Sequence, residues 1–265
     1  MAERTKIKLG EQIGKGNQGA VYMGVATIKG QERQVAVKVI TKESNAYRET
    51  AILKRLPEHK NLVKLLEGLS STKGVLLVFE YISDAKDMTK YRSESPLSTR
   101  SLDVFYQIAD GVSALHAFNI LHRDLKPANV MLKGTVPFII DYGSACSLDS
   151  LAGVTACTGW VGTPNYMAPE VWTDKRYSYE SDIYSLGATF YMLVSRTPPY
   201  PSDAKKDVVE VLRKLITDPD NQPKMLVCNI SALTTLVMRM IDKSAKNRPQ
   251  IKEVKEKLAD MIKQS

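Results

Sequence analysis

One stretch of eight residues constrains this chain more than any other part of it. Residues 122–129 (His-Arg-Asp-Leu-Lys-Pro-Ala-Asn) place a carboxylate, two cations and an amide close together, and a second carboxylate, Asp141, follows in residues 139–143 (Ile-Ile-Asp-Tyr-Gly). A reaction at a phosphate ester needs such groups, because the incoming hydroxyl needs a base, the developing charge needs a cation and Mg²⁺ needs oxygen ligands. The stretch therefore indicates phosphate chemistry.

A glycine-rich stretch near the N-terminus points to the same chemistry. Residues 13–21 (Ile-Gly-Lys-Gly-Asn-Gln-Gly-Ala-Val) have the pattern of a hairpin between two strands. Bare backbone at Gly14, Gly16 and Gly19 lets peptide N–H groups approach phosphate oxygens closely. A dinucleotide-binding unit would have a helix directly after the glycines, whereas residues 21–25 (Val-Tyr-Met-Gly-Val) continue as a strand.

These segments, in this order along the chain, resemble the eukaryotic-type serine/threonine protein kinases. Residues 122–129 match the family's catalytic loop, His-Arg-Asp-Leu-x-x-x-Asn. Further segments match as well, namely residues 35–38 (Val-Ala-Val-Lys), 141–143 (Asp-Tyr-Gly), 162–164 (Gly-Thr-Pro) and 167–170 (Met-Ala-Pro-Glu). The resemblance extends from Ile13 to Met261, which is nearly the whole chain of 265 residues.

The resemblance implies an α+β fold of the bilobal kinase type, with a small β-rich N-lobe that holds one key helix and a larger, mainly helical C-lobe. We expect one domain over residues 1–265, with an N-lobe at 1–79, a hinge at 80–85 and a C-lobe at 86–265. The hydrophobic spacing agrees, since it predicts strands over residues 34–40 and 75–79, and helices over residues 44–56 (ended by Pro57), 101–118, from 181 onward, 233–241 and 251–261.

The resemblance also assigns residues to an ATP site. Lys38 would hold the α- and β-phosphates, and Glu49 would pair with Lys38. Ala36 would lie over the adenine and Met131 under it, while Phe79 would close the back of the pocket. The backbone of Glu80 and Ile82 would bind the adenine edge. The glycine loop would cover the phosphates through Ile13, Gly14, Lys15, Gly16, Asn17, Gln18, Gly19 and Val21.

The catalytic roles follow from the same resemblance. Asp124 would accept or orient the proton of the substrate hydroxyl, and Lys126 would stabilise the γ-phosphate. Asn129 and Asp141 would bind Mg²⁺, with Mn²⁺ as an alternative. Thr163 would hydrogen-bond both Asp124 and Lys126. Lys126 and the Gly-Thr-Pro segment are typical of kinases that phosphorylate serine or threonine in proteins.

Several other residues are expected to support the site. Asp182 would brace the backbone of the catalytic loop, and Arg248 would form a buried pair with Glu170. Tyr142 stands where most kinases have phenylalanine, and a buried phenol needs a hydrogen-bond partner. We expect Tyr142 to stack between His122 and Leu53, with Leu65 above, when the kinase is assembled.

Residues 141–170 resemble an activation loop. Arg123, beside the catalytic carboxylate, favours control by a phosphate in this loop, because a guanidinium needs an anion to hold it. Thr155 and Thr158 are the candidate acceptors, ahead of Ser147 and Ser150. The position that many kinases phosphorylate, three residues before Gly162, is Gly159. We see no separate regulatory domain, and expect control to come from the loop, from an upstream kinase or regulatory protein, or from sequence outside this chain.

The chain contains three cysteines, Cys146, Cys157 and Cys228. A sparse, odd number argues against a disulfide framework and favours a reducing compartment. We therefore expect free thiols and a cytoplasmic protein, with the nucleus as an alternative. Cys146 and Cys157 lie in the activation loop, where redox control is the alternative to inert thiols.

The net charge of +8 is scattered, without a run of five basic residues. We therefore expect neither nucleic acid nor membrane as a partner, and the chain lacks the roughly 20 consecutive apolar residues that span a bilayer. Ala128 and Lys86 occupy positions where kinases that prefer upstream arginine often carry acids. This argues against a strong preference for basic substrates.

Two other functions compete with an active protein kinase. The same fold could serve as a nucleotide-binding pseudokinase or scaffold, and Tyr142 is the one departure that favours it, because Lys38, Asp124 and Asp141 are all present. A small-molecule phosphotransferase is disfavoured by the Gly-Thr-Pro and Ala-Pro-Glu segments, which build a peptide platform.

Overall fold

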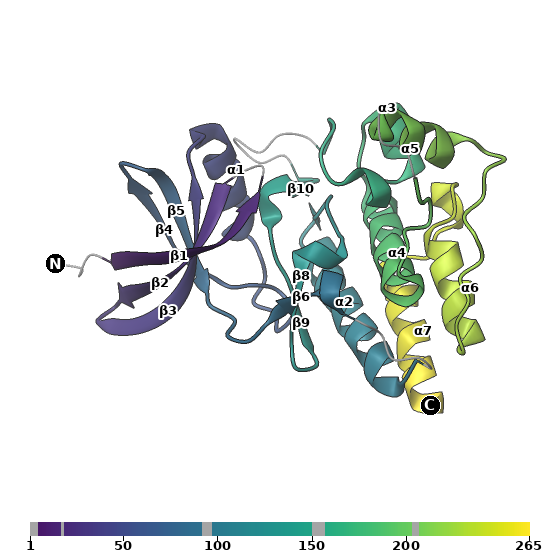
Figure 1. Cartoon of the computed structure of the whole chain (residues 1–265), viewed down its shortest axis with the longest axis horizontal. Coiled ribbons are helices and arrows are strands. Elements are labelled where there is room, and N and C mark those ends of the chain that lie inside the picture. The colour runs from purple at the N-terminus through teal and green to yellow at the C-terminus, as the bar shows by residue number, and fades with distance from the viewer. Residues whose placement is uncertain (1–4, 17–18, 92–96, 150–156, 203–206) are drawn as a thin grey trace.

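The computed structural model describes residues 5–16, 19–91, 97–149, 157–202 and 207–265. The predicted site residues Asn17 and Gln18, and the candidate phosphorylation sites Ser150 and Thr155, lie outside these ranges. Figure 1 shows a β-sheet with one helix on one side of the molecule and a bundle of helices on the other, with short strands between them.

The sheet has five antiparallel strands in the order β1-β2-β3-β5-β4. Alternation along the strands buries Val35 and Val37 on one face, where they pack with Val78, while Ile40 and Leu77 belong to the main core. The strands are β1 (Lys6–Gly16), β2 (Gly19–Ile28), β3 (Gln31–Ile40), β4 (Leu65–Ser71) and β5 (Gly74–Glu80).

Helix α1 (Glu43–Leu53) lies between β3 and β4 in the chain and ends three residues before the predicted end of the helix. Its buried residues are Ala46, Glu49, Ile52 and Leu53, a spacing that puts them on one face. The helix ends early because Pro57 disfavours helical backbone at the residue before it, and the N–H groups of Arg55 and Leu56 already turn back by three residues, to the carbonyls of Ile52 and Leu53.

The helical part is built around α2 and α4. Phe105 and Phe190 stack between these two helices with ring centroids 4.6 Å apart. Helix α2 packs on α7, and α4 packs on α6, where a Cβ on Gly187 would lie only 2.6 Å from the Cβ of Met240. The helices are α2 (Thr99–Ala117), α3 (Pro169–Asp174), α4 (Tyr179–Ser195), α5 (Val208–Thr217), α6 (Ser231–Met240) and α7 (Ile251–Gln264).

Two small sheets lie between the five-stranded sheet and the helices (Figure 1). One joins β6 (Lys86–Asp87), β8 (Val130–Lys133) and β9 (Val136–Ile139), and the other pairs β7 (Ile120–Leu121) with β10 (Cys146–Ser147). The segment between β7 and β8 is the stretch that begins at His122, so these strands fix both of its ends. Short 3₁₀ turns follow at Pro127–Asn129, Tyr142–Ser144 and Pro164–Tyr166.

The predicted α+β architecture is confirmed, with a sheet in the N-terminal region and helices in the C-terminal part. The helix predicted from residue 181 begins at Tyr179, where the hydroxyl of Ser181 reaches back to cap the N–H of Ser178. Within the residues that the structure describes, no helix is long and apolar enough to cross a membrane.

The predicted pair of Arg248 and Glu170 is confirmed and anchors α3 to the loop before α7. Arg248 donates from both terminal nitrogens to the two carboxylate oxygens, at 2.6 and 2.8 Å, and its guanidinium lies 5.0 Å from the ring centroid of Tyr184. The Arg248 side chain is fully buried, so its charge depends on this partner.

We predict that Glu170→Gln lowers the free energy of unfolding by about 3 kcal/mol, because it leaves a buried guanidinium without its counter-charge. Urea denaturation measures this change. Arg213→Gln, which breaks the exposed pair with Glu210, is the matched control and should change stability much less. Equal losses for the two variants would contradict a structural role for the buried pair.

Candidate active site

A buried ammonium group joins the sheet, helix α1 and the segment after β9. Lys38 on β3 donates to both carboxylate oxygens of Glu49 on α1, at 2.8 and 2.9 Å, and to Asp141 Oδ1 at 2.7 Å. The predicted contact between Lys38 and Glu49 is therefore confirmed. Burial alone would lower the pKa of Lys38, but the two carboxylates outweigh it and raise that pKa, so the ammonium stays charged.

Asp141 is held beside the catalytic segment by backbone geometry. The N–H of Ile140 donates to the carbonyl of Asn129 at 3.0 Å, so the chain around Asp141 runs directly against the end of the 122–129 stretch. Asp141 has a left-handed backbone with φ of 60°, and its carboxylate accepts the N–H of Gly143. Burial opposes its ionisation, but Lys38 lowers the pKa of Asp141 overall, which keeps an anion there.

Asn129 and Asp141 fit a magnesium site by chemistry, and Asp141 also by exposure. The Asp141 side chain is 45% exposed although Lys38 contacts it. The side-chain hydrogen bonds of Asn129 to other described residues all use Nδ2, so its Oδ1 can serve as an oxygen ligand. Within the described part of the chain no three His, Cys, Asp or Glu side chains could hold a metal. Two protein ligands suit Mg²⁺, which usually takes its remaining ligands from phosphates and water.

Three side chains converge on the carboxylate of Asp124. The Thr163 hydroxyl donates to Asp124 Oδ1 at 2.7 Å, and Lys126 Nζ and Asn129 Nδ2 approach Oδ2 at 2.9 and 3.0 Å. Lys126 also donates to the Thr163 hydroxyl at 2.5 Å. The predicted contacts of Thr163 with Asp124 and Lys126 are thus confirmed, and they hold an acid and a cation side by side.

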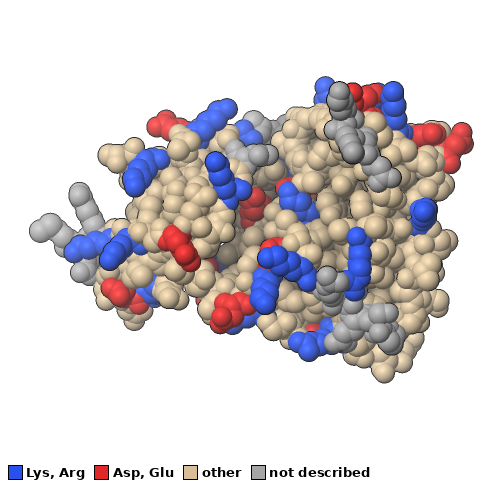
Figure 2. Space-filling view, viewed as in Figure 1, with Lys and Arg blue, Asp and Glu red and all other residues tan. Residues whose placement is uncertain are grey.

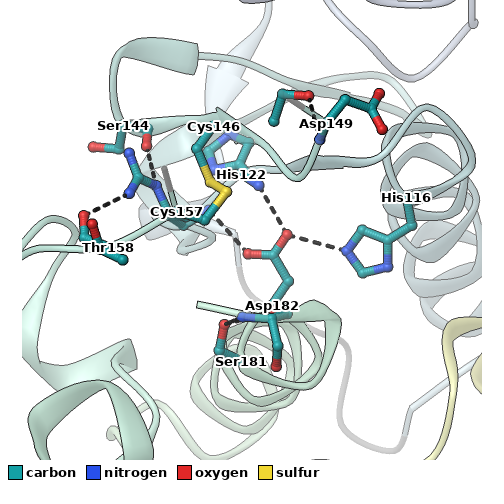
Figure 3. Close-up of a disulfide and its surroundings, with 12 residues drawn as sticks. His116, His122, Ser144, Cys146, Asp149, Cys157, Thr158, Ser181 and Asp182 are labelled. Atoms are coloured by element: carbon teal, nitrogen blue, oxygen red, sulfur yellow. Dashed lines mark hydrogen bonds and ion pairs between the residues drawn. A yellow bond between two sulfur atoms is a disulfide. The ribbon is translucent and has the colours of Figure 1, made fainter. Parts of the chain in front are cut away.

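The backbone of the catalytic segment is fixed from below by Asp182 of α4. Its carboxylate accepts the N–H groups of His122 and Arg123 at 2.8 and 2.9 Å, and it lies 3.1 Å from His116 Nε2 (Figure 3). Burial would raise the pKa of Asp182, but these partners lower it, so the fully buried group stays an anion. The predicted bracing role of Asp182 is confirmed.

Gly162 brings its own segment into contact with the backbone of residues 122–129. Its φ is +95°, and a Cβ there would lie 2.5 Å from the carbonyl oxygen of Arg123. No residue with a side chain fits without displacing that backbone. Gly162 therefore sets the position of Thr163 next to Asp124.

Tyr142 is buried, and it contacts His122 as predicted, but with the two rings tilted rather than stacked. Its ring lies 5.3 Å from that of His122 at an angle of 57°, and Leu53 and Leu65 belong to the same hydrophobic cluster. The phenol donates to the carbonyl of Ile139 at 3.2 Å, which satisfies its hydroxyl. Burial raises the pKa of Tyr142, so the phenol stays neutral.

The described nucleotide-binding residues of the prediction lie on β1, β2, β3, β5 and β8 and on the segment after β5. Gly14 pairs with Val21 and Gly16 with Gly19, which makes the hairpin end of β1 and β2 that also carries Ile13 and Lys15. Ala36 on β3 pairs with Phe79 on β5, Glu80 ends β5, Ile82 follows it, and Met131 lies on β8. Figure 2 shows a hollow between the sheet-bearing part and the helical part, with acidic and basic side chains inside it.

The prediction of free thiols is correct for Cys228 and wrong for Cys146 and Cys157, which form a disulfide. Their Cα atoms lie 5.5 Å apart, within the range that a disulfide spans. Pairing of β10 with β7 and a backbone hydrogen bond from Tyr177 to the Cys157 carbonyl bring them together. Cysteine number and spacing carry no signal for these tertiary contacts.

Sequence reasoning also missed the contacts of Arg123. Its Nε donates to the carbonyl of Ser144 at 2.6 Å, and its Nη1 donates to the carbonyl of Thr158 at 3.2 Å. The guanidinium lies 5.1 Å from the ring centroid of Tyr177. Burial lowers the pKa of Arg123 to about 10, and the charge of Arg48 acts in the same direction.

Comparison with known proteins identifies the family. The family model described as the protein kinase domain matches residues 7–258. A protein of Acanthamoeba polyphaga mimivirus whose name assigns it to the serine/threonine-protein kinases is 30% identical over 90% of this chain and 88% of its own. The fold and the site are those of a phosphotransferase. This chain belongs to the protein kinase family, and its class is serine/threonine protein kinase.

Other relatives are longer proteins. The serine/threonine-protein kinase PkaA of Streptomyces coelicolor is 32% identical over 92% of this chain, and the serine/threonine-protein kinase pkn2 of Myxococcus xanthus is 28% identical over 90% of it. The chain spans 48% and 30% of these two relatives.

We predict that Thr163→Val lowers kcat about 10- to 100-fold, because it removes hydrogen bonds to a carboxylate and an ammonium group. KM for ATP should stay unchanged, since no contact joins Thr163 to the Lys38 group. Steady-state kinetics on a protein substrate measure both constants. Thr163→Ser keeps the hydroxyl and should retain most activity; a Val variant with parental kcat would refute the assignment.

Proposed function

We propose that this kinase transfers the γ-phosphate of ATP, with Mg²⁺, to serine or threonine hydroxyls of protein substrates, between an N-lobe at residues 1–79 and a C-lobe at residues 86–265 that a hinge at 80–85 connects. The observation that carries this proposal is the arrangement at Asp124, whose carboxylate is oriented by Thr163, Lys126 and Asn129. Asp124 is thus a base held in a fixed orientation, with the Lys126 ammonium beside it and the peptide platform next to it.

Asp124 orients the acceptor hydroxyl and accepts its proton. The Thr163 hydrogen bond fixes the direction of Oδ1, and the Asp182 contacts hold the backbone that carries the carboxylate. Lys126, 2.9 Å from Asp124, stabilises negative charge on the phosphoryl group as it moves toward the acceptor. A base and a cation at this distance serve proton acceptance and charge stabilisation together.

Lys38 binds the α- and β-phosphates. Glu49 holds the ammonium in place from α1, and because the pKa of Lys38 is raised the charge is present when ATP arrives. The backbone of the glycine hairpin approaches the phosphates from above, while Ala36, Phe79 and Met131 surround the adenine. The backbone of Glu80 and Ile82 binds the adenine edge.

Asn129 and Asp141 hold Mg²⁺, and Mn²⁺ is the alternative ion. Both side chains present oxygen atoms, and the hydrogen bond between Ile140 and Asn129 keeps their segments adjacent. When bound, the metal neutralises phosphate charge and fixes the phosphate geometry. Asp141 and Asn129 are themselves held in place, because Lys38 donates to Asp141 and the Asn129 amide donates to the Asp124 carbonyl.

The choice of acceptor rests on the platform from Gly162 to Glu170. Its Thr163 holds Asp124 close to the platform, which suits the short side chains of serine and threonine, whose hydroxyls lie near the peptide backbone. Lys86 is exposed and basic, and Ala128 is apolar, which gives no acid to recognise an upstream arginine. The proposed substrates are therefore proteins without a strongly basic sequence before the acceptor.

Control of the enzyme is proposed to act on the activation loop in the cytoplasm. Thr158 is exposed, and its carbonyl is already bound to Arg123, so an upstream kinase could modify its hydroxyl near a buried cation. Thr155, the other candidate, lies outside the described residues.

We predict that Asp124→Asn lowers phosphate transfer about 10²- to 10⁴-fold, as loss of a general base does. Transfer of labelled phosphate from MgATP to a mixed protein substrate, followed by mapping of the modified residues, measures this. Asp174→Asn, at an exposed position on α3, is the matched control and should be fully active.

Phosphate on serine or threonine that disappears with Asp124→Asn supports the proposal. Full transfer by the Asn variant would contradict the role of Asp124. Stabilisation of the parent protein by ATP without any transfer, even after phosphorylation of the loop, would favour a nucleotide-binding scaffold instead.

A further inference from the structure

The disulfide joins two segments that flank the catalytic machinery (Figure 3). Cys146 lies on β10 and pairs with Leu121 of β7, directly before His122. Cys157 lies where the chain returns toward the peptide platform, and its carbonyl accepts the N–H of Tyr177 at 2.9 Å. Both cysteines are buried, so the bond is part of the packed structure rather than an exposed crosslink.

Arg123 connects the same two segments without a covalent bond. Its guanidinium bridges the carbonyl of Ser144, two residues before Cys146, and the carbonyl of Thr158, one residue after Cys157. Both acceptors are neutral carbonyls, and the guanidinium has Arg48 as a nearby like charge and Asp182 as a nearby opposite charge. Hydrogen bonds from a guanidinium to neutral carbonyls are weaker than those to a carboxylate, so Arg123 holds the two segments together less firmly than an ion pair would.

The segment after the disulfide leads directly to the catalytic base. Gly159 donates to the carbonyl of Lys175 at 2.8 Å, and the Tyr177 hydroxyl donates to the carbonyl of Val161. Gly162 packs against the backbone of Arg123, and Thr163 binds Asp124. The disulfide is thus the first of a series of anchors that set where the platform lies relative to Asp124.

We propose that Cys146 and Cys157 are positioning residues. Their disulfide forms and breaks reversibly, and when formed it holds the peptide platform (residues 162–170) in place relative to Asp124. This inference rests on the proposed function, because it concerns how the same site receives its protein substrate. In the dithiol state the segment loses its covalent link to β10 and is held by non-covalent contacts alone, which include those of Arg123, Tyr177 and Gly159 with Lys175. ATP binding is unaffected, since Lys38 and Glu49 lie on β3 and α1, and Asp141 precedes both cysteines and is held by Lys38.

The exposed fractions of Cys146 and Cys157 indicate which sulfur a reductant attacks first. Cys146 is fully buried and Cys157 is 8% exposed, so an external thiolate reaches the sulfur of Cys157 first. That attack forms a mixed disulfide and releases Cys146 as a thiolate, which takes up a proton. The second thiol of the reductant then attacks its own sulfur in the mixed disulfide and releases Cys157 as a thiol.

The reductant is therefore a dithiol, which ends as a cyclic disulfide after giving two electrons and two protons to the protein. Closing runs in the opposite direction, with an external disulfide as the oxidant and two external thiols as products. A chain with few cysteines and one disulfide beside its active site resembles a redox-sensing protein more than a disulfide scaffold.

The test uses the full chain, equilibrated at graded ratios of reduced to oxidised dithiothreitol, with the fraction of open disulfide measured by thiol alkylation and mass spectrometry. We expect KM for the protein substrate to rise about 10- to 100-fold in the open state, because small displacements of a substrate platform are costly, while KM for MgATP changes less than about twofold. Activity should return on reoxidation.

Two variants separate this role from a general loss of stability. Cys157→Ser should behave like the reduced parent at every redox ratio, while MgATP still stabilises it against heat. Cys228→Ser, the matched control at the free cysteine, should keep the full redox response. A redox response that disappears with Cys228→Ser would overturn the proposal.

Equal kinetics in the open and closed states would overturn this proposal and leave the kinase assignment intact. A disulfide that an excess of dithiol cannot open in the folded chain would overturn its reversibility. Absence of phosphate transfer at every redox ratio would overturn the proposed function and this inference with it.

Discussion

The arrangement of the site depends on one buried cation. Lys38 on β3 lies between Glu49, which is 11 residues away on α1, and Asp141, which is 103 residues away beyond β9. An ammonium group removed from water needs such partners, and each carboxylate needs the ammonium in turn, because an unpaired buried charge is strongly destabilising. The sheet, helix α1 and the segment that carries Asp141 are therefore held in one arrangement by the contacts of Lys38.

Two further buried charges, Asp182 and Arg248, fix the position of segments in the helical part. Asp182 holds the backbone of residues 122 and 123 from α4, and Arg248 ties Glu170 of α3 to the loop before α7. The apolar core supplies most of the stability, whereas these ion pairs and backbone contacts fix directions and distances. Asp124 thus reaches its place through anchors that do not themselves take part in phosphate transfer. We propose that the disulfide is a further anchor of this kind, which positions the peptide platform.

Much of the site could be predicted from the sequence, and what could not has a physical reason. The contacts of Lys38 with Glu49 and of Thr163 with Asp124 were predictable because local motifs carry them. The helix over 44–56 was predicted to end three residues too late, since the chain already turns at Arg55 and Leu56 before Pro57. The left-handed backbone at Arg123 and Asp141 was missed because neither is glycine. The disulfide was missed because it depends on strand pairing that cysteine spacing does not encode.

If Lys38 is the cation on which the site depends, Glu49 should affect ATP binding only by holding Lys38 in place. The most direct measurement is the Kd of MgATP, by calorimetry, for the parent, Glu49→Gln, Lys38→Met and the double variant. The account predicts that Glu49→Gln weakens binding in the parent but adds little once Lys38 is gone, which gives a coupling free energy of about 1–3 kcal/mol. Losses that simply add would show that the two residues act independently and would contradict the account.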